Sequence, residues 1–285
     1  MIPEGFAGYL GRLGIVPSGT PSVEELFALQ RAHLERIPYE NVGIQLDRPP
    51  GMEAELSVRR FAAGQGGYCF HLNGGFAALL EALGYDVTRH VGGVHQDPRG
   101  RGATGDHMAL TARVGGEGWF VDVGLGDGPH EPLPLRAGTY RQGPFTYRME
   151  PSATEPGGWT FHHDERSAFP VMEFRGEAAA PEDFAEEHRR LSTAADSPFT
   201  TTFTALRREP GAVHVLRGRV LLRIGAAGVE QRVVDLPDEW FGLLAGLFRR
   251  DPGDLDAADR SALWERVSRA HDKWLESRRE TAGRA

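Results

Sequence analysis

The only cysteine of the chain, Cys69, lies where the sequence most clearly predicts chemistry. It stands in the segment GQGGYCFHLNGGF, in which glycines lead directly to the cysteine and an apolar, helix-like pattern follows it. This order predicts a sulfur at the N-terminus of a helix, where unpaired N–H groups favour the thiolate over the thiol and lower its pKa. The same N–H groups suit a developing oxyanion. A solitary cysteine is more often an inert core residue, so the residues around Cys69 must show whether it is a nucleophile.

A thiolate nucleophile needs a base that takes its proton and returns it to the leaving group, and imidazole has a suitable pKa. Of the eleven histidines, His107 is the best candidate, because it opens the strand-like segment HMALTARV directly after the glycine-rich loop GRGATGD. Asp122 follows within the apolar segment WFVDVGLG. A carboxylate there is costly unless it is paired, and an imidazole N–H would both pair it and be oriented by it.

The spacing of His107 and Asp122 favours a direct contact between them. Two antiparallel strands joined by the turn GGEG would place the two side chains next to each other. Each residue alone has a simpler interpretation, since His107 could be a surface or capping histidine and Asp122 could cap the turn before GLGDG. The order Cys, His, Asp is that of papain-like cysteine enzymes, and the three residues together predict a catalytic triad.

Helical patterns dominate the first ~85 residues, which must hold the cysteine in place. Residues 22–37, SVEELFALQRAHLERI, carry apolar residues at helical spacing and are bounded by Ser22 and Pro38. A second helix is predicted from about Cys69 onward, with Gly84 where a C-cap glycine would stand.

After Tyr85 the pattern changes to short strands separated by glycine, proline and charged turns. These strands are predicted in DVTRHVGGV, HMALTARV, WFVDVGL, FTYRME and WTFHHD, as a half-open sheet or small barrel. From Ala178 onward the patterns are mixed, with helices in PEDFAEEHRRLS, DEWFGLLAGLFRR and SALWERVSRAHDKWLESRR and strands in AVHVLRGR and VLLRIG. The predicted regions are residues 1–85, 86–177 and 178–285.

Composition narrows the choice of partners and compartment. The formal net charge of −8 and the lack of Lys/Arg runs argue against nucleic acid, and no segment approaches the roughly 20 apolar residues of a membrane span. The N-terminus lacks the basic and apolar regions of a signal peptide. One cysteine forms no internal disulfide, which suits a reducing compartment, so we expect a cytoplasmic protein. We predict no metal site, because the neighbours His162 and His163 would face opposite sides of a strand.

The residues around the triad resemble the arylamine N-acetyltransferases, whose cysteine motif reads Arg-Gly-Gly-Tyr-Cys-Phe-Glu-x-Asn. Here the motif stands as QGGYCFHLN at residues 65–73. The resemblance continues upstream in RAHLERIPYEN and downstream in His107-Met108 and VDVGLG. It covers roughly the first 135 residues well and the remainder only loosely, through SPFTTTF and the LRGRVLLR strand pair.

The resemblance implies an α+β fold in three parts: an N-terminal helical bundle bearing the cysteine, a central antiparallel β-barrel bearing His and Asp, and a C-terminal α/β lid. It implies ping-pong acyl transfer, in which acetyl-coenzyme A, a co-substrate and not a permanent cofactor, acylates the cysteine and an arylamine or hydrazine then attacks the thioester. The nucleophile would be Cys69, the acid/base His107 and the orienting group Asp122. The donor would contact Thr104 and Gly105, and the substrate Phe70, Leu125 and Gly126.

Three positions depart from the family pattern. Gln65 replaces an Arg and His71 a Glu, and we hypothesise that the family's two charges pair, so that their joint loss is neutral for the fold. Leu125 stands where many relatives carry a Phe against the aromatic acceptor. The absence of the Phe ring removes about 0.5–1.5 kcal/mol of aromatic contact. It predicts a weak preference for arylamines.

Other functions use the same residues. A close alternative is amide synthesis on a larger acyl chain, such as macrolactam formation, in which a carrier protein would be the partner. A cysteine hydrolase or a transglutaminase-like enzyme would use the same triad order with water or a protein amine as acceptor. A non-catalytic binding module would leave Cys69 with ordinary thiol reactivity.

Overall fold

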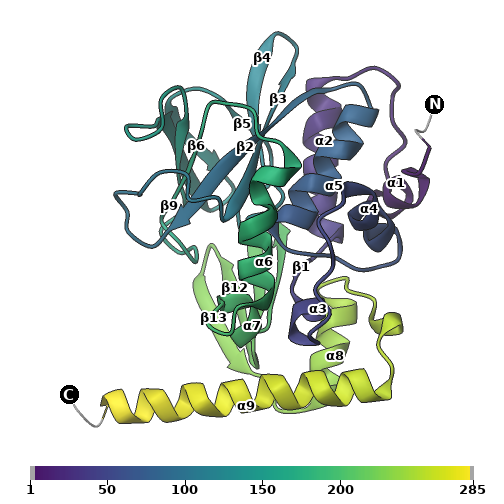
Figure 1. The fold of residues 1–285 in the computed structure, drawn as a ribbon, viewed down its shortest axis with the longest axis vertical. Coiled ribbons are helices and arrows are strands. Elements are labelled where there is room, and N and C mark those ends of the chain that lie inside the picture. Colours follow the sequence, from purple (N-terminus) through teal and green to yellow (C-terminus); the bar gives the residue numbers. More distant parts are fainter. Residues whose placement is uncertain (1–3, 283–285) are drawn as a thin grey trace.

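The computed structural model describes residues 4–282 and places helices at the start of the chain, a large sheet in the middle and a second sheet with helices at the end (Figure 1). The α+β class predicted for the chain is confirmed. The helices are α1 (Ala7–Leu13), α2 (Val23–Arg36), α3 (Val42–Gln45), α4 (Ala54–Ala62), α5 (Cys69–Ala82), α6 (Ala185–Thr193), α7 (Pro198–Thr201), α8 (Pro237–Gly246) and α9 (Ala257–Ala282), with short 3-10 turns η1 (Pro181–Phe184) and η2 (Pro252–Asp254).

Helix α5 is the centre of the N-terminal helices, and it begins at Cys69 as the sequence predicts. It carries so many apolar residues that nearly every side chain is buried, against α4 on one side and the neighbouring strands on the other. Gly84 follows the helix with a φ of 91°, a conformation that favours glycine. The predicted helix α2 is also confirmed, and the hydroxyl of Ser22 caps it by accepting from the Glu25 N–H at 3.1 Å.

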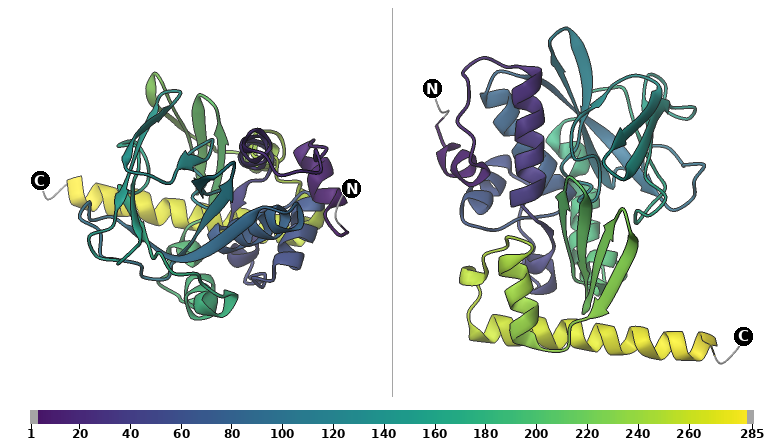
Figure 2. Two further views of the ribbon diagram at one scale, coloured as in Figure 1. Left: turned by 90° about the horizontal axis from the view of Figure 1, so that it is seen from above. Right: turned by 180° about the vertical axis from the view of Figure 1, so that it is seen from behind.

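An eight-stranded antiparallel sheet forms the middle of the chain and curls into a nearly closed barrel (Figure 2). Its interior is filled by rings from alternating positions of the strands, among them Phe120, Tyr147, Phe161 and Phe174. In spatial order the strands are β5 (Leu133–Pro134), β4 (Glu117–Val121), β3 (His107–Val114), β2 (Asp86–His95), β9 (Val171–Phe174), β8 (Trp159–His162), β7 (Phe145–Pro151) and β6 (Gly138–Gln142).

The hairpin of β3 and β4 sets the positions of the predicted acid/base and its partner. Its register runs from Leu110 opposite Val121 to Val114 opposite Glu117, so Gly115 and Gly116 alone form the turn. Their φ values are 63° and 80°, as a two-residue hairpin turn with positive φ at both positions requires. The predicted antiparallel pairing is therefore confirmed, and it brings the start of β3 beside the end of β4.

A second antiparallel sheet of five strands forms the C-terminal part, and its first strand comes from the N-terminal half. Trp240, Leu244 and Phe248 fill the core between this sheet and the last helices. Helix α9 runs along the base of the molecule to the C-terminus (Figures 1 and 2). The strand order is β1 (Tyr39–Glu40), β10 (Thr204–Glu209), β11 (Ala212–Arg217), β12 (Val220–Gly225) and β13 (Gly228–Val233).

Strand β1 connects the N-terminal region to the C-terminal sheet, because Tyr39 pairs with Leu206 in β10. The boundaries predicted at residues 85 and 177 stay a prediction. Within residues 4–282, no helix combines the length and the apolar character that crossing a bilayer requires.

We predict that the turn conformation of Gly116 contributes measurably to stability. A methyl group here would meet no atom within 4 Å, so the Gly116→Ala variant isolates the cost of a positive φ. We expect a loss of about 1 kcal/mol in the free energy of unfolding, measured by urea denaturation. Gly116→Asn should lose less, since asparagine tolerates this conformation. Equal stability of the alanine variant and the parent would contradict the assignment.

Candidate active site

Cys69 occupies the first position of α5 and is almost completely buried. Its Sγ lies 3.7 Å from the carbonyl oxygen of Asp106, across the gap between α5 and the loop before β3. Gly124 lies against it, and a methyl group on that glycine would come within 3.0 Å of the Cys69 Cα. The sulfur is therefore enclosed by the helix start and by the two loops that flank the hairpin.

His107 and Asp122 form a buried pair beside the sulfur, as the sequence predicts. The Nε2–H of His107 donates to Oδ2 of Asp122 at 2.7 Å, which leaves Nδ1 for the hydrogen bond with the Cys69 side chain. The other carboxylate oxygen of Asp122 accepts from the N–H groups of Gly124 and Leu125 at 2.8 and 3.0 Å. Asp122 thus caps the turn and pairs with His107 at once, and its role in a triad stays a prediction.

The protonation equilibria differ from the expectation for a helix N-terminus. Burial raises the pKa of the Cys69 thiol, and the hydrogen bond and charge of His107 act in the opposite direction. The expected lowering of the thiol pKa is therefore wrong, because desolvation of the sulfur outweighs the groups that stabilise the thiolate. For His107, burial alone lowers the pKa, but the charge and hydrogen bond of Asp122, and then those of Cys69, raise it to about 10. His107 consequently holds a proton strongly, which places a cation beside the sulfur.

A cleft of about 450 Å³ opens onto Cys69 and His107. Its walls come from the N-terminal segment, the barrel and the C-terminal sheet, and most of the lining side chains are apolar. A neutral, partly apolar substrate suits such a surface, and water has little access to the thioester that Cys69 would form. The cleft includes Tyr39, Leu125, Phe169, Phe199, Leu206 and Ile224.

Of the three residues predicted to contact substrate, one lines this cleft, and a second lies between two residues that do. Leu125 is part of the cleft lining. Gly126 has a φ of 77°, and a methyl group there would come within 3.2 Å of the Tyr39 ring, so its glycine permits the close approach of two cleft walls. Phe70 instead is fully buried in the core, with its ring 5.5 Å from those of Tyr68 and Phe184. Its expected substrate contact therefore has no basis in this position.

The residues predicted to contact the donor, Thr104 and Gly105, shape the loop that precedes His107. The hydroxyl of Thr104 donates to Asp106 at 3.0 Å, and the N–H of Gly105 donates to Gly92 O at 2.8 Å. The next two residues, Asp106 and His107, line the cleft, whereas Thr104 and Gly105 do not. The donor contacts of Thr104 and Gly105 stay a prediction.

Asn73 holds the helix of the nucleophile against the strands of the other two residues. Its amide nitrogen donates to Met108 O at 2.6 Å, and its amide oxygen accepts from the Val123 N–H at 2.9 Å. These partners directly follow His107 and Asp122 in the sequence. An asparagine in the middle of an apolar helix indicates such a role, because a buried amide must find hydrogen-bond partners. In the sequence this residue stood out only as part of the cysteine motif.

The two replaced motif residues have separate partners in the fold. The imidazole of His71 caps α5, because Nδ1 accepts from the Tyr68 N–H at 3.3 Å and Nε2–H donates to Pro50 O at 3.3 Å. The amide of Gln65 donates to Asp254 at 3.0 Å. His71 thus caps α5 with a neutral ring.

A second His–Asp pair borders the cleft without reaching the sulfur. His163 donates to Asp127 at 3.2 Å, whereas its neighbour His162 bonds to Glu150 at 2.6 Å on the other face of the strand. This alternation agrees with the expected divergence of the two histidines. Among the described residues, no group of three or more His, Cys, Asp or Glu side chains could hold a metal ion.

Comparison with known proteins identifies the class to which this fold and site belong. A family model described as N-acetyltransferase matches residues 22–249. The arylamine N-acetyltransferase of Mycolicibacterium smegmatis is 30% identical over 276 residues, which are 90% of this chain and 95% of that protein. The solved structure of the Mycobacterium marinum arylamine N-acetyltransferase in complex with CoA matches with a TM-score of 0.83 and 26% identity, covering 93% of this chain and 99% of that one.

The chain belongs to the arylamine N-acetyltransferase family of acyltransferases. It is also 35% identical to proansamycin X synthase of Amycolatopsis mediterranei over 147 residues, which are 50% of this chain and 56% of that protein. The chain thus spans only about half the length of that relative.

We predict that Asn73 is a positioning residue. Asn73→Ala leaves a buried carbonyl and a buried N–H without their partner, which should cost about 2–4 kcal/mol in the free energy of unfolding. Because the helix start then moves relative to His107, iodoacetamide labelling of Cys69 should also slow in the folded variant. Asn73→Gln, which keeps the amide, should recover part of this loss. Normal labelling in a destabilised alanine variant would limit Asn73 to a structural role.

We predict that His71 makes the fold acid-sensitive. Burial, together with the nearby His188, lowers the pKa of His71 to about 3, so the folded state takes up this proton far less readily than the unfolded chain does. Stability should fall by about 1 kcal/mol for each pH unit below ~6.5 on account of this group. His71→Gln keeps a capping acceptor but does not titrate. Its urea midpoint should fall less between pH 7 and pH 4.5; parallel curves for both proteins would exclude this role.

Proposed function

We propose that this chain is an N-acyltransferase that moves an acyl group from a coenzyme A thioester to an amine through a thioester on Cys69. The observation that carries the proposal is the buried hydrogen bond of His107 to Asp122 at 2.7 Å, with the Cys69 sulfur on the other ring nitrogen at the floor of an apolar cleft. Membership of the family supports acyl transfer over hydrolysis by the same triad. A cytoplasmic location fits, because a nucleophilic thiol must stay reduced.

The reaction follows from the proton positions. Cys69 Sγ attacks the thioester carbonyl as the thiolate, while its proton is held on Nδ1 of His107 as an imidazolium that Asp122 stabilises. Collapse of the tetrahedral intermediate breaks the bond to the donor sulfur, which takes the proton from His107. In the second half the amine attacks the Cys69 thioester, His107 takes an N–H proton, and that proton returns to Cys69 Sγ as the amide leaves.

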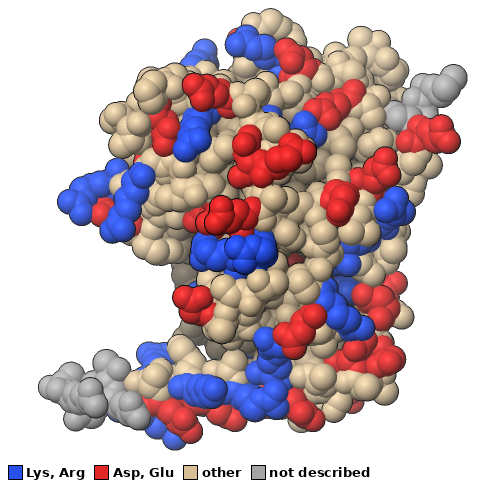
Figure 3. Space-filling model, viewed as in Figure 1, with Lys and Arg blue, Asp and Glu red and all other residues tan. Residues whose placement is uncertain are grey.

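A basic groove next to the cleft supports a phosphate-bearing donor. It has a volume of about 800 Å³ and lies between the C-terminal sheet and α9. Arg217, Arg269 and Lys273 supply positive charge, and Thr202 and Leu222 line both the groove and the cleft, as does Arg217. In Figure 3 the face is hollowed above α9, and Lys and Arg side chains gather along that helix. We infer that the phosphates of a coenzyme A thioester bind in this groove while the acyl end reaches Cys69.

Amide synthesis on a larger acyl chain is the second candidate. Two observations favour it: the similarity to proansamycin X synthase, and Leu125 at the cleft, where an aliphatic side chain suits an extended acyl chain as well as a ring. In that reaction the donor would be a thioester on a carrier protein, whose phosphopantetheine arm would enter by the same basic groove.

Intact-protein mass spectrometry after incubation with acetyl-coenzyme A tests the proposed function. The wild type should gain one acetyl group, and Cys69→Ser should gain none. Asp122→Asn should stay folded but transfer acetyl to an arylamine about a thousand-fold or more slowly, because His107 loses its orienting acceptor. Transfer by Asp122→Asn at a near-normal rate would remove the triad from the mechanism. Acylation by larger coenzyme A thioesters but not by acetyl-coenzyme A would favour the second candidate.

A further inference from the structure

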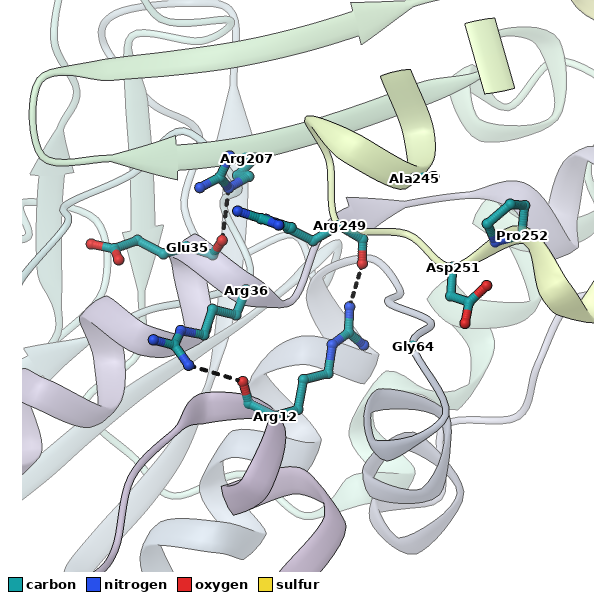
Figure 4. A pocket seen from close by; sticks show the side chains of 9 residues that line it. All are labelled: Arg12, Glu35, Arg36, Gly64, Arg207, Ala245, Arg249, Asp251 and Pro252. Carbon is teal, nitrogen blue, oxygen red and sulfur yellow. Dashed lines mark hydrogen bonds between the residues drawn. The ribbon is translucent and has the colours of Figure 1, made fainter. Parts of the chain in front are cut away.

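Four arginines surround a hollow that shares no lining residue with the catalytic cleft (Figure 4). The hollow has a volume of about 630 Å³ and lies where α1 and α2 meet β10 and the segment after α8. Its cationic residues come from three distant parts of the sequence: Arg12, Arg36, Arg207 and Arg249. In a chain with a formal net charge of −8, such a concentration of positive charge requires an explanation.

The two acidic residues of the hollow are engaged elsewhere. Glu35 accepts from His130 at 2.8 Å, and Asp251 accepts from the Gly253 N–H at 2.9 Å. Of the four arginines, Arg207 has a carboxylate partner, Glu209, at 2.9 Å. Among the side chains described, those of residues 4–279, no carboxylate forms a salt bridge with the other three. Within that part of the chain these three guanidinium groups therefore have no direct ionic partner, although the charges of Asp251 and Glu40 act on Arg12 from nearby.

Backbone contacts hold these guanidinium groups in place without neutralising them. Arg12 donates to Phe61 O and Gln65 O at 2.7 Å and to Arg249 O at 2.5 Å. Arg207 donates to Glu35 O at 2.7 Å and to Leu247 O at 2.9 Å. These carbonyl partners fix the geometry of the hollow, so little ordering is left for binding to complete.

The two more exposed arginines are placed by backbone features. Arg36 Nη1 would lie 2.3 Å from a methyl group on Gly14, so the glycine at the end of α1 makes room for this guanidinium. Arg249 has a φ of 59°, a conformation that costs a non-glycine residue energy. A glycine would remove that cost, yet this position carries a cation directed toward the hollow, where Figure 4 shows it beside Arg207.

We propose that this hollow binds a multiply charged phosphate anion, such as pyrophosphate or the polyphosphate end of a nucleotide. Guanidinium groups pair with phosphate oxygens in a planar, two-bonded geometry, and several converging groups match an anion with several charges. Burial, with Arg250 nearby, lowers the pKa of Arg12 to about 10, and a bound anion would favour its charged form.

The anion site would lie on the face of β10 opposite the catalytic cleft. Residues of β10 alternate, so that Thr204 and Leu206 line the cleft whereas Arg207 faces the hollow. An anion here would bridge the N-terminal helices, β10 and the loop after α8. Because it binds the folded chain only, it should raise the unfolding temperature in a saturable way.

Titration of the full-length chain with inorganic pyrophosphate, followed by calorimetry and by thermal unfolding, tests the proposal. The measurement uses no acyl donor, so its outcome is independent of the proposed acyl transfer. We expect saturable binding to the wild type and at least about tenfold weaker binding to the double variant R36Q/R249Q. The charge-matched control R113Q/R141Q, which alters exposed residues of the barrel, should bind as the wild type does.

A further variant separates binding from folding. R249G removes the cation but relieves the positive φ and keeps the carbonyl that accepts from Arg12, so without anion it should unfold at or above the wild-type temperature. It should nevertheless bind pyrophosphate more weakly. Equal affinities in the wild type, R249G and R36Q/R249Q, or no saturable binding at constant ionic strength, would overturn the proposal and leave the arginines as contacts between helices.

Discussion

The structure depends above all on a buried hydrogen bond between an imidazole and a carboxylate, His107 Nε2–H to Asp122 Oδ2. Neither group would be tolerated alone in so apolar a place, because each loses its hydration on burial. The surrounding fold satisfies both: two N–H groups of the turn complete the carboxylate, and the sulfur of Cys69 completes the imidazole. The same hydrogen bonds therefore compensate the burial of these groups and set their protonation.

Those contacts require three separate elements to meet within hydrogen-bond distance. The hairpin of β3 and β4 fixes His107 relative to Asp122, and Asn73 fixes α5 relative to both strands. Gly124 lets α5 approach closely, since any side chain there would strike Cys69. Precise placement of the nucleophile thus follows from backbone geometry and one buried amide, and the apolar core supplies the bulk of the stability.

Local patterns in the sequence were sufficient for the parts of the fold that depend on nearby residues. The helix from Cys69, the helix after Ser22 and the two-glycine hairpin carry their start and stop signals within a few residues, and all three are confirmed. Six strands were missed: β1, β5 and β9, which have only two to four residues, and β6, β10 and β13, which are longer but largely polar or charged. Short segments have too little periodicity to identify them, and only the tertiary contacts define them.

The sequence indicated which three residues would meet but not what surrounds them, and their catalytic roles stay a prediction. The three residue types and their order indicated the triad, whereas the walls of the cleft come from Tyr39, Phe199 and Leu206, which only the fold assembles. The direction of the thiol pKa was also beyond the sequence, because it depends on how completely Cys69 is buried. Phe70 adjoins the nucleophile in sequence, but one step along a helix turns its side chain by about 100° and into the core.

The replacement of a carboxylate by His71 has a consequence for the nucleophile. A capping carboxylate at this position would place a negative charge one turn from the sulfur and oppose its ionisation. The neutral ring makes the same cap without that charge, and burial keeps it neutral at physiological pH. Gln65 likewise adds no charge beside the motif, because its amide bonds to Asp254. With both charges absent, His107 is the cation that acts on the sulfur, so the ionisation of Cys69 depends on the proton of one imidazole and, through it, on Asp122.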